Sequence, residues 1–307
     1  MLALLAPASL SAQDSVDTAV LMRDLQVLAA DDMAGRGAGT EGSRRARNYI
    51  ARRFAELGLE VHLAPFRYPA AGGRSEEGTN VWVLVRGTER PDKVIVVGAH
   101  YDHVGVRERE IYNGADDNAS GTAALFAIAA ALRPTPPRHS VMLVAFDAEE
   151  LGLFGSRVFV QGPPVPKENI LLNINLDMVA RGDGGVLWAA GPRIYPALRP
   201  AVQAAADAAS ITVRFGQDYR PARPGWGRGD LTLRSDQAAF GIAGIPFVFF
   251  TAGDHRDYHK PTDDAELVEA GFYSGAVAAV LDTFRRLDAD SAALDAARRD
   301  GDKPRWR

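Results

Sequence analysis

The chain has 307 residues, of which 47% are hydrophobic and 24% charged, and its formal net charge is −4. This composition supports a large buried core, and the lack of a basic stripe argues against nucleic acid as a partner. The chain has no cysteine, which excludes disulfides, cysteine catalysis and thiolate metal sites. The metal ligands that remain are Asp, Glu and the six His.

The N-terminal sequence MLALLAPASLSAQDSVD is apolar, then rich in small residues, and becomes polar after Ala12. We interpret residues 1–12 as the remnant of a secretory signal peptide, with an ordinary flexible terminus as the alternative, and expect a periplasmic or secreted protein. No later run reaches the roughly 18 apolar residues of a membrane helix, so we expect no membrane insertion.

The first half of the chain carries helical and strand periodicity in turn. Leu21, Leu25 and Leu28 have helical spacing, and Thr40 precedes an amphipathic segment that ends at Gly58. A continuous run of Val and Ile from 94 to 97 suits a strand buried on both faces. We expect, in order, a helix at 17–31, a loop at 31–43, a helix up to 57, a strand at 59–63, a loop at 69–78, and strands at 79–85 and 93–99.

The second half repeats the alternation of strands and helices. We expect a helix at 120–132, a strand at 140–146, a helix at 151–160, a strand at 170–176, a helix at 195–208, a short helix at 235–241, a strand at 246–251 and a last helix at about 266–287. Such alternation predicts an α/β three-layer sandwich.

No internal repeat or clean domain boundary interrupts the pattern. We therefore expect one catalytic domain over 17–288, followed by a charged tail at 289–307 that is a frayed helix or disordered. The segment 217–231 is rich in Gly, Pro and Arg and exceeds the usual length of a connection, which indicates a functional loop.

Acids and histidines gather where the predicted strands end. Open α/β sheets place their active sites at the carboxyl ends of their strands. Burying so many acids together requires a compensating charge, and a pair of divalent metal ions is the natural one. The residues concerned are His100 and Asp102, the pair Asp116 and Asp117, the pair Glu149 and Glu150, Asp177, and His259.

The spacing His-x-Asp places His100 and Asp102 on the same side of a strand. Asp102 can then accept the second ring N–H of His100, as metal-binding histidines require. A mixed set of His and carboxylate ligands suits zinc best, with manganese or cobalt as possible substitutes. Two metals require a bridging carboxylate, which an acid in the turn-rich loop 113–121 can supply.

Five ordered motifs together resemble the co-catalytic zinc aminopeptidase family, which includes bacterial leucyl aminopeptidases and glutamate carboxypeptidases. They are His100-Tyr-Asp102, the segment GADDNASG (114–121), the segment FDAEELGLFGS (146–156), Asn175-Leu-Asp-Met178 and the segment DYHKPTDD (257–264). The resemblance covers nearly the whole chain after residue 16. It implies a mixed, largely parallel sheet flanked by helices.

Carried over to this chain, the resemblance implies two Zn²⁺ ions bridged by Asp117. His100 and Asp177 would complete the ligands of one ion, and Glu150 and His259 those of the other. Glu149 would be the general base that takes a proton from the water between the metals and delivers it to the leaving amine. The implied substrates are peptides with a free N-terminus.

The resemblance also implies supporting roles. Asp102 would orient His100, Tyr258 would hydrogen-bond the developing oxyanion, and the peptide bond after Asp117 is a candidate for the cis form. Many relatives have histidine where this chain has Gln237, so the role of that position is open. Outside the resemblance, His255 has no assigned role. Asp116 is expected either to support the loop that carries Asp117 by capping or to face water, and not to bind a metal directly.

The remaining histidines, His62, His103 and His139, are interpreted as surface or supporting groups rather than ligands. One competing reading is a glutaminyl cyclase-like transferase with a single zinc. The other is a non-catalytic binding domain on the same fold. All five ligand positions and Glu149 are present, which favours the peptidase. The sequence leaves the oligomeric state, the preferred N-terminal residue and the choice between aminopeptidase, carboxypeptidase and dipeptidase open.

Overall fold

A mixed eight-stranded sheet forms the centre of the computed structural model, which describes residues 16–218 and 230–301. Its strands are β1 Val61–Pro69, β2 Ser75–Val85, β3 Arg90–His100, β6 His139–Phe146, β7 Ile170–Leu176, β8 Val186–Ala190, β9 Thr212–Phe215 and β10 Phe247–Thr251. They lie in the order β1-β2-β6-β3-β7-β10-β8-β9. The central strands β6, β3, β7 and β10 run parallel, whereas β2 and β8 pair with them antiparallel.

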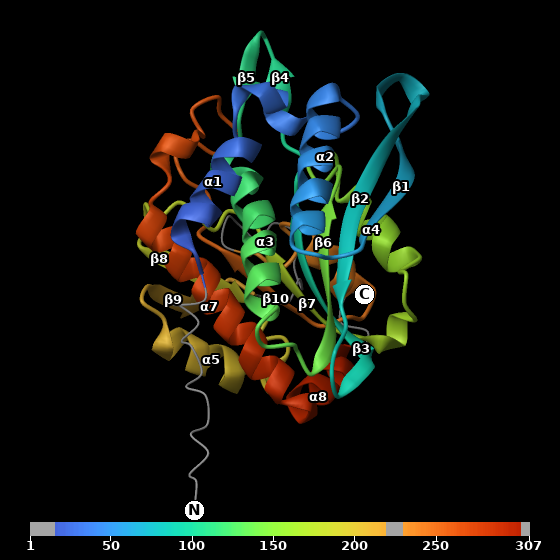
Figure 1. Cartoon of the computed structure of the whole chain (residues 1–307), viewed down its shortest axis with the longest axis vertical. Helices are drawn as coiled ribbons and strands as arrows, with labels where there is room; N and C mark the ends of the chain where they lie inside the picture. Colours follow the sequence, from blue (N-terminus) through green and yellow to red (C-terminus); the bar gives the residue numbers. More distant parts are fainter. Residues whose placement is uncertain (1–15, 219–229, 302–307) are drawn as a thin grey trace, which may run out of the picture.

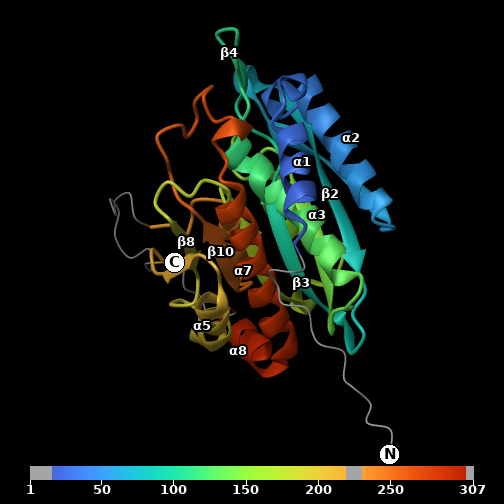
Figure 2. The ribbon, with the colours of Figure 1, turned by 60° about the vertical axis from the view of Figure 1, so that its left-hand side comes forward.

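Helices cover both faces of the sheet, which confirms the predicted three-layer sandwich (Figures 1 and 2). The helices are α1 Thr18–Leu28, α2 Glu41–Glu56, α3 Gly121–Leu132, α4 Phe154–Gln161, α5 Arg199–Ala208, α6 Gln237–Ile242, α7 Ala270–Ala289 and α8 Ser291–Gly301. The face seen in Figure 1 is covered by α1, α2, α3 and α7, and the opposite face by α4 and α6.

The core follows from the alternation of side chains along the strands. In β3, Ile95 and Val97 pack into the larger core beneath α1, α2, α3 and α7. Val94 and Val96 pack into the core beneath α4 and α6. This arrangement explains why the strand is apolar throughout, and it confirms the prediction of a strand buried on both faces.

The first two helices begin where their capping residues predict. The carboxylate of Asp17 accepts hydrogen bonds from the backbone N–H groups of Ala19 and Val20, at 3.0 and 3.1 Å. The hydroxyl of Thr40 accepts one from the N–H of Ser43, at 3.3 Å. These side chains satisfy N–H groups that have no partner inside the helix, so they fix its first turn.

Several short elements were absent from the prediction. Strands β8 and β9 lie at one edge of the sheet, and β4 Gly105–Arg107 pairs with β5 Glu110–Tyr112 in a separate hairpin. Periodicity over three to five residues is a weak signal, so only pairing with a neighbouring strand defines them. Helix α4 begins at Phe154 rather than Leu151, because Leu153 has a left-handed φ of 61°.

The tail was expected to be frayed or disordered, and this is wrong for residues 291–301, which form α8. Leu294 and Ala297 are buried, and a Cβ on Gly301 would overlap the carbonyl of Gly244. Residues at 294, 297 and 301 share one face of a helix, and that face docks on the body of the protein. Residues 302–307 lie outside the described residues.

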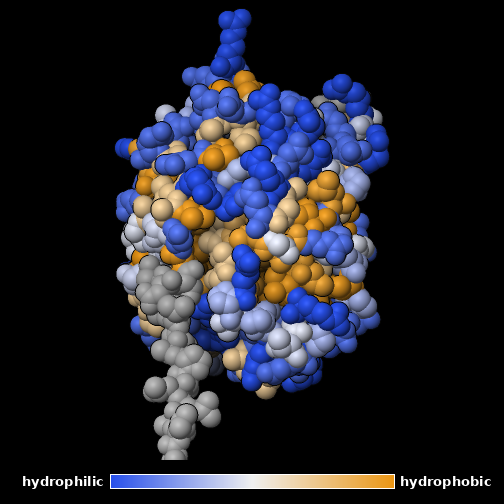
Figure 3. All heavy atoms as spheres, viewed as in Figure 1, coloured by the Kyte–Doolittle hydropathy of each residue, from blue (hydrophilic) through white to orange (hydrophobic). Residues whose placement is uncertain are grey.

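Charged and polar side chains cover most of the face seen in Figure 1, and apolar ones gather near its middle (Figure 3). In the described ranges 16–218 and 230–301, the structure contains no helix with the length and apolar character needed to cross a membrane. The predicted signal remnant at 1–12 and most of the predicted loop 217–231 lie outside those ranges, so both stay predictions.

Candidate metal centre

The predicted site residues meet at one edge of the sheet. His100 is the last residue of β3, and Asp177 follows the last residue of β7. Glu149 and Glu150 follow β6, and His259 lies in the loop after β10. Parallel strands present their carboxyl ends at the same edge, which brings these distant segments together. Asp117 reaches them from the turn Ala115–Ser120, which precedes α3.

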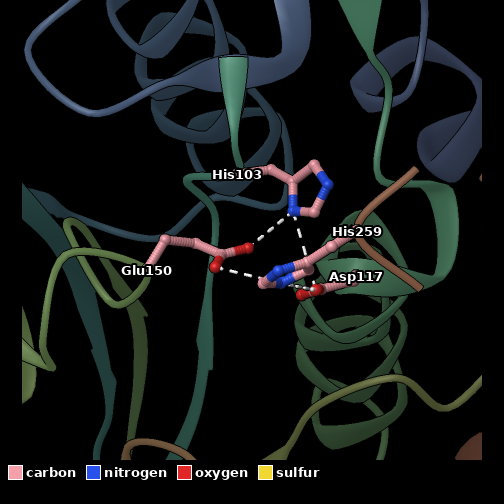
Figure 4. Close-up of side chains that lie close together, drawn as sticks. All are labelled: His103, Asp117, Glu150 and His259. Atoms are coloured by element: carbon pink, nitrogen blue, oxygen red, sulfur yellow. Dashed lines mark hydrogen bonds and ion pairs between the residues drawn. The ribbon is translucent and has the colours of Figure 1, made fainter. Parts of the chain in front are cut away.

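The donor atoms form two groups that share Asp117. In the first group, Nε2 of His100 is 3.3 Å from Oδ1 of Asp177 and 3.4 Å from Oδ1 of Asp117. In the second, Nε2 of His259 is 3.0 Å from Oδ2 of Asp117 and 3.1 Å from Oε2 of Glu150 (Figure 4). The two oxygens of Asp117 therefore face different groups.

These groups fit divalent cations. Nε2 of His100 and Oδ1 of Asp177 are buried, and neither has a hydrogen-bond partner among the described residues. Buried polar atoms of this kind are costly unless a ligand satisfies them. Ligand atoms bonded tetrahedrally to zinc lie roughly 3.3 Å apart, which is close to the separations within both groups.

The loop that carries Asp117 is tied down through its backbone. The carboxylate of Asp263 accepts hydrogen bonds from the N–H groups of Asp116 and Asp117, each at 3.1 Å. The buried Arg36 donates to carbonyl groups on the same loop, including that of Gly114 at 2.8 Å. The peptide bond between Asp117 and Asn118 is cis, as the resemblance implied. Asp117 is therefore placed by interactions that do not use its own carboxylate.

Asp102 acts on the site differently from the prediction. Nδ1 of His100 is 3.1 Å from the main-chain oxygen of Asp102 and 3.8 Å from its carboxylate. The carboxylate instead accepts hydrogen bonds from the backbone N–H groups of Glu149 at 2.9 Å and Glu150 at 3.3 Å. Asp102 thus orients His100 through its backbone, and its side chain fixes the Glu149–Glu150 turn.

Asp116 is buried and supports the loop, one of the two roles left open by the sequence. Its Oδ1 accepts hydrogen bonds from the N–H groups of Ala180 at 2.7 Å and Arg181 at 3.2 Å. Nε2 of His255 lies 3.4 Å from its other oxygen, Oδ2. His255 therefore belongs to the support of the loop that carries Asp117.

Gln237 is a buried bridging residue. Its side-chain oxygen accepts a hydrogen bond from Nδ2 of Asn175 at 3.0 Å, and its Nε2 donates to the main-chain oxygen of Leu231 at 2.8 Å. The amide of Gln237 uses its donor and its acceptor at once, so it links β7 to the segment before α6.

The electrostatics of the site reflect burial among carboxylates. Burial, reinforced by the nearby Asp236 and Asp177, raises the pKa of Glu149 well above its ordinary value. Burial also opposes the charged form of Glu150, but hydrogen bonds from His103 and His259 outweigh it and lower the pKa of that carboxyl. Two neighbouring carboxyl groups, Glu149 and Glu150, therefore have pKa values shifted in opposite directions by their surroundings.

A cavity opens onto these donor groups. Met178, Leu231 and Phe249 form its apolar wall, and Tyr258 also lines it. The ring of Tyr258 stacks on that of His259, with 4.0 Å between ring centroids. A cavity with a partly apolar lining therefore adjoins the donor atoms.

The polar mouth of the cavity contains a paired arginine. Arg234 and Asp254 both line the cavity. Nη2 of Arg234 contacts both carboxylate oxygens of Asp254, at 2.9 and 3.0 Å. The positive charge of Arg234 is therefore already matched by a neighbouring carboxylate.

Of the two roles that the sequence analysis left open for His103, surface or supporting group, the structure favours the supporting one. His103 is buried, and its Nδ1 lies 2.7 Å from Oε1 of Glu150. Its position directly after Asp102 in His-Tyr-Asp-His was the available signal. The other two histidines of that group lie elsewhere: His62 stacks on Trp82, and His139 is paired with Asp288.

The fold and the donor groups define a metal-binding α/β sandwich with its site at the carboxyl edge of the sheet. The family model described as Peptidase family M28 matches residues 80–284, and the chain belongs to that family.

A curated relative, Aminopeptidase YwaD of Bacillus subtilis, is 31% identical over 198 residues, which are 59% of this chain and 38% of the relative. The chain spans less than half the length of the curated relatives it matches first.

Two solved structures share the fold. BSAP, described as a zinc aminopeptidase from Bacillus subtilis, has a TM-score of 0.73 at 17% identity, covering 87% of this chain and 94% of that one. A glutaminyl cyclase from Bacteroides thetaiotaomicron has a TM-score of 0.71 at 18% identity, covering 88% and 98%.

Proposed function

We propose that this chain is a zinc-dependent exopeptidase that removes N-terminal residues from peptides. The observation that carries the proposal is the position of Asp117 between two pairs of donors, each consisting of one histidine and one carboxylate. A carboxylate with one oxygen in each of two such groups suits a pair of metal ions. Membership of a peptidase family and likeness to a protein described as a zinc aminopeptidase support the choice of reaction and metal.

The proposed ligands divide as the donor groups do. His100 and Asp177 would hold one zinc ion, Glu150 and His259 the other, and Asp117 would contact both. Manganese or cobalt would be possible substitutes, because these donors bind them as well. Bound zinc supplies Lewis-acid polarisation of the scissile carbonyl and a lower pKa for the attacking water.

The residues of the chain itself would move the proton and stabilise the developing charge. Glu149 lines the cavity next to the donors, and its raised pKa suits a group that accepts a proton from water and donates it to the leaving amine. Tyr258 lines the same cavity and carries a hydroxyl that can donate to the oxyanion. Asp102 would keep Glu149 in place through the backbone hydrogen bond described above.

Recognition of a free amino group fits the cavity better than recognition of a C-terminal carboxylate. A carboxylate is typically held by an arginine with free donors. Arg234, the arginine that lines the cavity in the described part of the chain, is paired with Asp254. Apart from Arg234 and two histidines, the ionisable side chains that line the cavity are mainly carboxylic acids, which suit an ammonium group. We therefore place peptides with a free N-terminus first among substrates.

Replacement of Glu149 by Gln tests the proposal. Loss of the proton acceptor should lower kcat for aminoacyl anilides by a factor of roughly 10² to 10⁴, while the zinc content stays unchanged. Glu60→Gln is the matched control, because the side chain of Glu60 is 87% exposed. Unchanged turnover in Glu149→Gln would overturn the assignment. N-acetylated peptides should not be cleaved, and efficient cleavage of them would refute the requirement for a free N-terminus.

A glutaminyl cyclase-like transferase is the second candidate, because a glutaminyl cyclase shares the fold. A peptide that begins with glutamine distinguishes the two reactions: the peptidase releases free glutamine, whereas the cyclase releases ammonia and a pyroglutamyl peptide. One zinc ion per active chain, combined with cyclisation, would favour the transferase. Catalytic turnover of either kind would exclude a purely non-catalytic binding domain.

A further inference from the structure

The histidine that follows Asp102 has no role in the proposed chemistry, although it lies inside the site. The side chain of His103 is fully buried, and Nδ1 is 2.7 Å from Oε1 of Glu150 and 3.7 Å from Oδ2 of Asp117 (Figure 4). Its ring packs edge-on against that of His259, with 5.5 Å between centroids. His103 therefore contacts the donor group formed by Asp117, Glu150 and His259.

The two oxygens of Glu150 have different neighbours. Oε1 faces Nδ1 of His103 at 2.7 Å, whereas Oε2 faces Nε2 of His259 at 3.1 Å. A separation of 2.7 Å is that of a charge-assisted hydrogen bond and is shorter than the roughly 3.3 Å between two atoms that share a tetrahedral zinc ion. Because a carboxylate that ligates a metal ion can only accept hydrogen bonds, this geometry assigns the proton to Nδ1 of His103.

The backbone around His103 restricts its ring to this orientation. Gly114 has a left-handed φ of 55°, and a Cβ at that position would overlap the imidazole of His103. The backbone N–H of His103 donates to the carbonyl of Arg36 at 3.4 Å. Nε2 of His103 is buried without a hydrogen-bond partner in the described part of the chain. The ring is thus held by packing at one end and by Glu150 at the other.

We propose that His103 is a positioning residue for metal binding, which donates Nδ1–H to Oε1 of Glu150 and directs Oε2 toward the ion shared with Asp117 and His259. The proposal rests on the metal site of the proposed function. Without this donor, the carboxylate of Glu150 rotates more freely and Oε1 loses its partner. Comparable hydrogen bonds to ligand side chains change metal affinity by roughly 10-fold to 100-fold.

Zinc affinity at the two sites tests the proposal independently of turnover. The metal-free protein is titrated with zinc against a chromophoric chelator, using the wild type, His103→Ala and His103→Asn. His103→Ala should weaken one of the two sites by roughly 10-fold to 100-fold and leave the other unchanged. His103→Asn should restore most of that affinity, because the asparagine amide places an N–H close to the position of Nδ1. His62→Asn is the control, since His62 lies on the sheet away from the donor groups.

Three results would overturn the proposal: wild-type affinity in His103→Ala, equal weakening of both sites, or no recovery in His103→Asn. X-ray absorption spectroscopy counts the imidazole ligands of bound zinc. One imidazole fewer in His103→Asn than in the wild type would identify His103 as a ligand instead. Thermal unfolding of the metal-free variants shows whether each one folds. If His103→Ala does not fold, the zinc affinity of His103→Asn still tests the proposal. If the wild type itself binds no zinc, the proposed function fails before His103 is in question.

Discussion

Arg36 offers a sharp test of how the loop that carries Asp117 is held. Its guanidinium is fully buried and donates to the main-chain oxygens of Leu28 at 2.7 Å, Tyr101 at 2.8 Å, Asn113 at 2.6 Å and Gly114 at 2.8 Å. Burial lowers the pKa of Arg36 to about 10, so the group remains charged at neutral pH. The perturbation is Arg36→Met, which removes the donors but keeps most of the side-chain length.

The expected cost follows from the acceptors left behind. Each buried carbonyl without a partner costs about 1–3 kcal/mol, but the loop relaxes and neighbouring losses do not add. The substitution also removes the cost of burying a cation away from water, which offsets part of the loss. We therefore expect Arg36→Met to lower the free energy of unfolding by about 4 kcal/mol. Arg36→Lys, whose ammonium has three donors, should lose about half as much.

Urea unfolding of the metal-free protein, followed by tryptophan fluorescence, measures this loss. With a slope of about 3 kcal/mol/M, the midpoint of Arg36→Met should fall by more than about 1 M. Arg44→Met is the matched control, because Arg44 is 55% exposed and pairs with Glu41 on the surface of α2. The control should change stability by less than about 0.5 kcal/mol. A loss below about 1 kcal/mol in Arg36→Met would refute the reasoning.

Two further predictions concern pH and backbone fit. Burial raises the pKa of Asp236 to about 6, so the folded state retains a proton that the unfolded state loses above about pH 4. The contribution of Asp236 to the free energy of unfolding therefore falls by about 3 kcal/mol as the pH rises from about 4 to 6. Urea unfolding with chelator should show that Asp236→Asn reduces the fall in stability between pH 4 and 6 by about this amount, and an unchanged pH dependence would contradict the assignment. Gly114→Ala would overlap the carbonyl of Asp117 and the ring of His103, so it should lower both thermal stability and zinc affinity. Gly184→Ala, which meets no atom within 4 Å, is its control, and equal effects in the two variants would be evidence against the packing argument.

Local patterns in the sequence predicted the central part of the fold well. The run from Val94 to Val97 and the amphipathic helix after Thr40 have strong periodicity, and both elements formed as expected. Strands β8 and β9 were absent from the prediction because their few residues become strands only by pairing at the edge of the sheet. Helix α8 was interpreted as a tail because its composition is polar, and the buried Leu294 shows that docking decides its structure.

The sequence predicted which residues gather at the candidate site, but not which of their atoms contact one another. Ordered motifs predicted a set of donors, and the structure brings all of these residues to one edge of the sheet. The acceptor of the His100 ring proved to be the main-chain oxygen of Asp102 rather than its carboxylate. The hydrogen bond between His103 and Glu150 joins residues 47 positions apart in the sequence, and no local sequence pattern predicts such a contact.

The sequence by itself determined which chemical groups stand at the ends of the strands, because those groups follow apolar runs directly along the chain. Tertiary structure decided which groups face one another, because the strand order β6-β3-β7-β10 brings together segments that are not consecutive. It also decided that Asp117 turns one oxygen toward His100 and the other toward His259. The direction of a side chain depends on packing and hydrogen bonds from distant segments, and these exist only once the sheet has formed.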